Sequence, residues 1–144
     1  MPTRNEHTIS IKKTILVHSA DTDLTRSISI FLQESFTVVT TQTVEELACQ
    51  RQNKEIALLV VDVEKNIQQL LEEFRLRAAE QCVAPIIALY AYRQSQPVLE
   101  KSLRAFASKV LYKPVPIDFV VNAIASELHL PDYTLLTPVK PIVK

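Results

Sequence analysis

Four short polar segments hold the side chains of this 144-residue chain that are best suited to chemistry. Each segment follows an apolar run. The four segments are Ser19 to Asp23, Asp62 to Glu64, Tyr90 to Tyr92, and Lys113 with Pro114. They supply carboxylates, hydroxyls and an ammonium group. A carboxylate takes part in group transfer when a nearby cation neutralises the charge that builds up around it. These segments form the candidate site if the fold brings them together.

The composition excludes several other kinds of site. The chain has no glycine, and phosphate-binding loops use glycine where the backbone must approach the anion. P-loop and dinucleotide-binding fingerprints are therefore absent in their usual form. The two cysteines and three histidines are scattered without the spacing of a zinc site. Serine, histidine and aspartate show no recognisable triad spacing, so we predict that the chain is not an enzyme.

Charge and hydropathy limit the partners and the location. Lys and Arg together number 16, as do Asp and Glu, so the formal net charge is zero. A neutral chain has no general attraction to nucleic acid or to an anionic membrane surface. Its apolar runs are far shorter than the roughly 20 residues that span a bilayer, and its polar start has no signal core. We expect a cytoplasmic protein without a nucleic-acid or membrane partner.

Strand-like apolar runs alternate with helical patterns about five times along the chain. The strand candidates are residues 14–17, 36–40, 56–61, 84–89 and 110–112. The strand 56–61 is predicted to stop at Asp62, and a loop is predicted from Tyr90 onward. This alternation predicts an α/β fold with a doubly wound parallel sheet. In such a sheet the carboxyl ends of the strands converge on one edge, which places the four polar segments together.

The order and spacing of these features resemble the receiver domain of two-component response regulators. The resemblance rests on Asp62 after the most hydrophobic strand, on the strand that ends near Tyr90, and on Lys113-Pro114 after the last strand. It covers residues 12–128 and implies a flavodoxin-like, five-stranded parallel sheet with strand order 2-1-3-4-5. Residues 1–11 are then a polar lead-in, and residues 129–144 a proline-containing extended tail.

The resemblance implies a role for each candidate residue. In receivers, the aspartate at the position of Asp62 accepts a phosphoryl group from a phosphohistidine of a partner, and a lysine contacts that group. Asp62 is therefore the phosphoacceptor candidate, Lys113 the phosphoryl-contact candidate and Tyr90 the residue at the switch position. The family also implies a cis peptide bond between Lys113 and Pro114. The implied protein partner is a histidine kinase or a phosphotransfer protein.

The metal site departs from the family pattern. Receivers hold Mg²⁺ with an acidic pair after the first strand, where this chain has Ser19 and Ala20. Because Mg²⁺ prefers oxygen ligands and usually takes carboxylates with waters, Asp62 would need substitute ligands from Asp21, Asp23 or Glu64. The weak metal candidates are therefore Asp62, Asp21 and Glu64, with Mg²⁺ as the cofactor that the resemblance implies.

The switch also departs from the pattern. Tyr90 replaces the Ser or Thr that contacts the phosphoryl group, and Val110 replaces the aromatic residue that usually couples to it. A tyrosine ring carries its hydroxyl much farther from the backbone. Tyr90 is therefore expected to cover the pocket rather than to sense its contents.

Three functional hypotheses follow. The first is a degenerate receiver, or pseudo-receiver, that acts mainly as a protein-interaction module. The alternative is a working but atypical phosphorelay receiver, phosphorylated on Asp62 with Mg²⁺ held by substitute ligands. A remote third hypothesis is a small flavin-binding domain or another enzyme on the same fold. For the receiver hypotheses, the resemblance implies a contact surface on the last two helices, which could also form a homodimer.

Overall fold

The computed structural model describes residues 12–64, 66–91 and 97–130 of the chain. Within these ranges a five-stranded, all-parallel sheet has the order β2-β1-β3-β4-β5. Its strands are β1 (Thr14–His18), β2 (Thr37–Thr41), β3 (Ile56–Val63), β4 (Ile86–Ala91) and β5 (Lys109–Lys113). The predicted α/β fold and the strand order implied by the resemblance are both confirmed.

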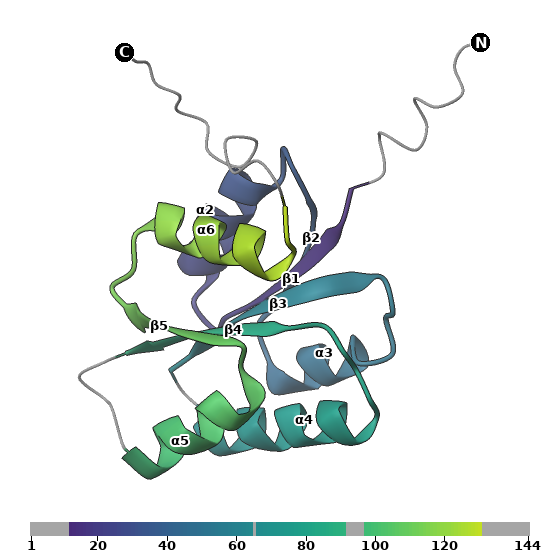
Figure 1. Cartoon of the computed structure of the whole chain (residues 1–144), viewed down its shortest axis with the longest axis vertical. Helices are drawn as coiled ribbons and strands as arrows, with labels where there is room; N and C mark the ends of the chain where they lie inside the picture. The colour runs from purple at the N-terminus through teal and green to yellow at the C-terminus, as the bar shows by residue number, and fades with distance from the viewer. Residues whose placement is uncertain (1–11, 65, 92–96, 131–144) are drawn as a thin grey trace.

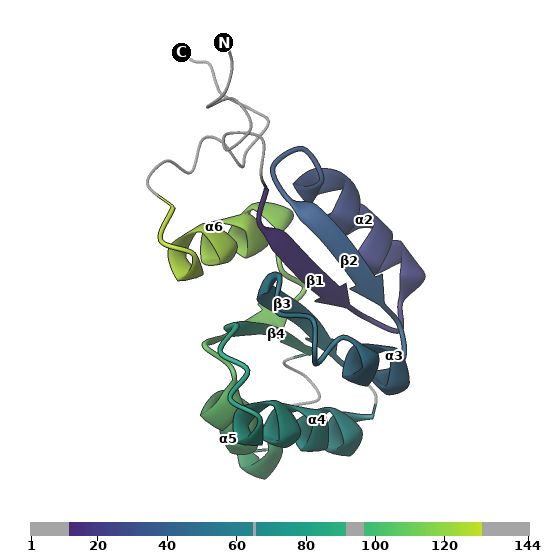
Figure 2. The same cartoon turned by 90° about the vertical axis from the view of Figure 1, so that its right-hand side faces the viewer.

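In the described part of the chain, helices cover both faces of the sheet. They are α2 (Thr22–Leu32), α3 (Val44–Cys49), α4 (Ile67–Ala79), α5 (Pro97–Phe106) and α6 (Ile117–Glu127). Helices α2 and α6 lie on one face, and α3, α4 and α5 lie on the other (Figures 1 and 2). Successive strand residues therefore enter different cores. Val60, for example, packs with residues of α2 and α6, whereas Val61 packs with residues of α4.

The central strand β3 carries Asp62 further into the sheet than the sequence indicated. Strand β3 does not stop before Asp62 but continues to Val63, and β4 includes Tyr90, which the sequence analysis placed in a loop. The parallel ladder explains both differences, because Asp62 pairs with Leu89 and Tyr90 pairs with Tyr112. Asp62 is therefore held in β3 by its pairing with β4 and does not lie in a loop.

The ends of the chain were predicted to be a lead-in and an extended tail. Residues 1–11 and 131–144 lie outside the described residues, so both boundaries stay predictions. After α6, the backbone N–H of Leu130 donates to the carbonyl of Ala125 at 3.0 Å, and Leu130 packs against the core beneath α2 and α6. Across the described ranges, no helix combines the length and the apolar character needed to cross a membrane.

Candidate functional site

The carboxyl ends of β1, β3 and β5 meet at one edge of the sheet and bring three of the four predicted segments together. Ser19 follows β1, Asp62 lies near the end of β3, and Lys113 is the last residue of β5. The ammonium Nζ of Lys113 lies 2.5 Å from Oδ1 of Asp62. The hydroxyl of Ser19 donates a hydrogen bond of 2.6 Å to Oδ2 of Asp62. Both carboxylate oxygens of Asp62 therefore have a donor supplied by the chain itself.

The Asp62 carboxylate is buried and its charge is neutralised internally. The residue is only 6% exposed. Burial of a carboxylate costs free energy unless the group is paired and hydrogen-bonded, and Lys113 and Ser19 meet both conditions. Lys113 Nζ also lies 3.5 Å from Oε1 of Glu64, which is more exposed. One ammonium group thus serves two carboxylates at this edge.

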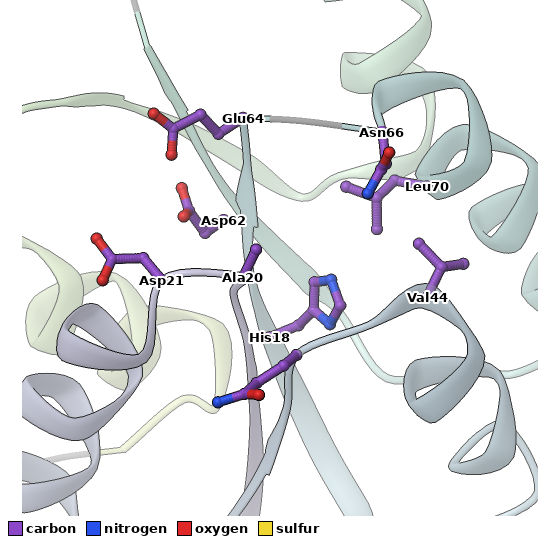
Figure 3. Close-up of a pocket in the computed structure, with 9 residues that line it drawn as sticks. His18, Ala20, Asp21, Val44, Asp62, Glu64, Asn66 and Leu70 are labelled. Carbon is purple, nitrogen blue, oxygen red and sulfur yellow. The ribbon is translucent and has the colours of Figure 1, made fainter.

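A cavity of about 260 Å³ opens beside Asp62 (Figure 3). Its walls come from the carboxyl-terminal edge of the sheet and from the start of α3 and α4. The lining residues are His18, Ala20, Asp21, Gln42, Val44, Asp62, Glu64, Asn66 and Leu70. The carboxylates and amides lie alongside apolar side chains, so the cavity presents both polar and apolar surface.

His18 belongs to this cavity, although the sequence analysis treated it as an ordinary residue at a strand end. It is 4% exposed, and its Nδ1 lies 2.8 Å from the hydroxyl of Thr41. Burial lowers the pKa of His18, and the negative charges of Asp62 and Glu46 oppose that effect. The ring is therefore neutral at pH 7. Its place at the end of the buried run Ile15 to Val17 was the signal available in the sequence.

Known structures share this arrangement of strands and helices, although no protein-family model matches the chain and no curated protein is significantly similar to it in sequence. A signal receiver domain from Vibrio parahaemolyticus matches with a TM-score of 0.72 at 14% identity, covering 87% of this chain and 95% of that one. Chemotaxis protein CheY4 from Vibrio cholerae gives 0.70 at 17% identity, covering 81% and 98%. A CheY-like receiver domain from Methanospirillum hungatei gives 0.69 at 22% identity, covering 83% and 95%. This chain has the receiver fold.

One backbone feature of the site also agrees with the receiver family. The peptide bond between Lys113 and Pro114 is cis, as the resemblance implied. Asp62 and Lys113, which the resemblance assigns to the acceptor and lysine positions, contact each other.

Receiver domains typically bind Mg²⁺ at an acidic site, but the side chains here do not fit that ion. Ala20 offers no ligand, and both oxygens of Asp62 are engaged. Asp21 caps α2, where its Oδ1 accepts from the backbone N–H groups of Asp23 and Leu24 at 3.0 and 3.3 Å. Within the described ranges, no three His, Cys, Asp or Glu side chains gather as metal ligands. The substitute set of Asp62, Asp21 and Glu64 is therefore not assembled.

Tyr90, which the resemblance assigns to the switch position, lies in the hydrophobic core. It is 1% exposed, and its ring centroid lies 6.4 Å from that of Tyr112 in β5. The Tyr112 hydroxyl contacts Glu100 and Arg104 of α5. Tyr90 is not among the residues that line the cavity beside Asp62. It reaches the core because β4 extends past Leu89, so its ring packs under α4 and α5 instead of covering the pocket.

The burial of His18 makes stability depend on pH. Because the pKa of His18 in the folded chain lies below its ordinary value of 6.5, the unfolded state binds the proton first as the pH falls. This contribution to stability is complete above pH 6.5 and is lost as the pH falls from there through the folded pKa. We expect the free energy of unfolding to fall in that window by at most about 1.4 kcal/mol per pH unit. Urea denaturation at a series of pH values measures it.

The matched control for this prediction is the exposed His129. His18→Asn should flatten the slope between neutral and mildly acidic pH, whereas His129→Asn should leave it unchanged. Equal slopes in the wild type and in His18→Asn would show that His18 does not set this pH dependence.

Proposed function

We propose that this chain is a signal-transduction domain of the two-component type that works in the cytoplasm, mainly as a non-enzymatic protein-interaction module. The observation that carries the proposal is the closed arrangement around Asp62. Lys113 and Ser19 occupy both of its oxygens, and among the described residues no three His, Cys, Asp or Glu side chains are grouped so that they could hold Mg²⁺. A phosphoryl acceptor needs its charge neutralised by groups that remain available to the incoming phosphate. Here the ammonium is already committed to Asp62 and Glu64.

The proposed contact surface lies on α5, β5 and α6. Val98 on α5 and Phe119 on α6 are large apolar residues that are 78% and 57% exposed. Charged side chains lie near them, and Arg104 pairs with Glu100 at 3.4 Å and Lys109 with Glu127 at 3.9 Å. Exposed pairs of this kind contribute little stability, so their charges are available to a partner. A histidine kinase, a phosphotransfer protein or a second copy of the chain would bind here.

Exposure to beryllofluoride or acetyl phosphate tests this proposal. We expect the wild-type chain to show no Mg²⁺-dependent mass increase with acetyl phosphate and no NMR shifts with beryllofluoride and Mg²⁺. A mass increase that is present in the wild type and absent in Asp62→Asn would instead establish a working phosphorelay receiver.

A restored acidic pair provides the positive control. The double variant Ser19→Asp, Ala20→Asp places two carboxylates where the receiver family carries them. It should acquire Mg²⁺-dependent shifts near Asp62, which would show that the assay detects a metal site in this chain. The stability of the double variant should be measured with and without Mg²⁺, because unpaired carboxylates at this edge repel one another.

A further inference from the structure

The cavity beside Asp62 carries an excess of negative charge. Asp21, Asp62 and Glu64 line it, and the ammonium of Lys113 is the cation in contact with two of them. Glu46 lies close enough for its negative charge to raise the pKa of His18, against the larger effect of burial. The amino ends of α2, α3 and α4 lie at the same edge, and each adds up to about half a positive charge. The three lining carboxylates and the nearby Glu46 together outweigh the one ammonium and these partial charges, and the remaining negative charge favours a cationic ligand.

His18 supplies an acceptor inside the same cavity. Its ring lies between Ala20 and Val44 in Figure 3, and the residue is 4% exposed. Nδ1 is paired with Thr41, whereas Nε2 has no hydrogen-bond partner among the residues that the structure describes. The Thr41 hydroxyl can accept the Nδ1 proton, which leaves a lone pair on Nε2. Because Nε2 is not among the fully buried atoms without a partner and His18 lines the cavity, this ring nitrogen is accessible to a ligand there.

The remaining walls suit a long side chain with a planar, donor-rich end. Val44 and Leu70 offer apolar surface for a methylene stem. Gln42 and Asn66 offer amide oxygens, and the Asn66 side chain is not used as a cap of α4. A guanidinium group has five N–H donors in one plane, so it can reach several acceptors at once, whereas an ammonium acts as a compact point charge.

We propose that this cavity binds the guanidinium group of an arginine side chain from a protein partner. The inference rests on the proposed role as an interaction module and adds a second contact to it, at the carboxyl-terminal edge of the sheet. The arginine would place its stem against Val44 and Leu70 and its donors toward Glu64, Asn66 and His18. A lysine would bind more weakly because it satisfies fewer of these acceptors.

NMR titration of the full chain with single amino-acid probes tests the pocket. Acetyl-arginine amide should give saturable shifts at His18 and Asn66, with a dissociation constant on the order of 1 mM for a ligand of this size. Acetyl-lysine amide should bind more weakly. Acetyl-citrulline amide has nearly the shape of the arginine probe without its charge, and it should bind at least about tenfold more weakly.

Two charge variants locate the binding site. Glu64→Gln removes an exposed carboxylate of the cavity. It should raise the dissociation constant of the arginine probe about two- to fivefold, as expected for a partly exposed ion pair. Glu34→Gln removes an exposed carboxylate after α2 and should leave binding unchanged. Equal shifts with the citrulline probe, no saturation, or no effect of Glu64→Gln would each overturn the proposal.

The failure of this inference can be told apart from failure of the proposed function. If the chain neither binds the arginine probe nor shows shifts with beryllofluoride and Mg²⁺, it remains an interaction module without this pocket contact. A chain that forms the Mg²⁺-dependent adduct on Asp62 is a working receiver, and the cavity is then its phosphorylation site rather than an arginine pocket.

Discussion

Replacement of Glu73 by alanine is expected to lower the free energy of unfolding by about 3 to 5 kcal/mol, the cost of breaking a buried ion-pair network by removing one partner. Glu73 of α4 is 3% exposed. Its carboxylate accepts from Arg51 at 2.5 and 2.9 Å and from Arg77 at 3.0 Å. Arg77 also donates to the carbonyl of Leu47, the residue that anchors α3. Without Glu73, the guanidinium of Arg77 stays buried with no carboxylate beside it.

The neighbouring Glu72 is the matched control. Its side chain is 55% exposed and pairs with Arg75, which is 61% exposed. Glu72→Ala removes the same chemical group from the same helix but should cost less than about 1 kcal/mol. Urea denaturation of both variants measures the difference. A Glu73→Ala chain as stable as the Glu72→Ala chain would show that the buried network does not hold α3 and α4 together.

Replacement of Lys113 by methionine is expected to lower the free energy of unfolding by about 2 to 3 kcal/mol at neutral pH. Among the described side chains, the variant leaves the buried Asp62 carboxylate hydrogen-bonded to the Ser19 hydroxyl alone. Loss of one partner of a buried pair usually costs about 3 to 5 kcal/mol, and the partial exposure of Lys113 reduces that value. Chemical denaturation of the wild type and the variant gives the number.

Two further variants isolate the Asp62–Lys113 interaction. Lys109→Met removes a lysine from the same strand that is 38% exposed and lies 3.9 Å from Glu127, and it should cost less than about 1 kcal/mol. Adding Asp62→Asn to Lys113→Met should recover part of the loss, with a coupling of about 1 to 2 kcal/mol in the double-mutant cycle. If Lys113→Met and Lys109→Met were equally stable, the pair would not be a buried one in solution.

The fold was predictable because local patterns agree with it everywhere along the chain. Apolar runs such as Ile56 to Val61 alternate with helical patterns, and this alternation permits few architectures other than a doubly wound parallel sheet. Parallel strands in turn bring their carboxyl ends to one edge. The meeting of Asp62 and Lys113, which are 51 positions apart in the chain, therefore followed from strand order and spacing.

Strand limits and side-chain directions were less predictable. The sequence analysis placed Tyr90 in a loop because polar residues follow it. In the structure, pairing with Tyr112 keeps Tyr90 in β4. Its ring then packs in the core, where a switch residue was expected to cover the pocket. Local sequence does not report the length of a neighbouring strand, and that length decides where a parallel strand ends.

The sequence by itself determined the sheet, the edge that carries the site, and the absence of an acidic pair at Ser19 and Ala20. These follow from residue types and from periodicity, which act over a few positions. Only the tertiary structure decided what the remaining side chains do there. The Ser19 hydroxyl donates to Asp62, and the buried His18 lines the cavity beside it. Such contacts depend on burial and on distances between separate strands, and no pattern of neighbouring residues encodes them.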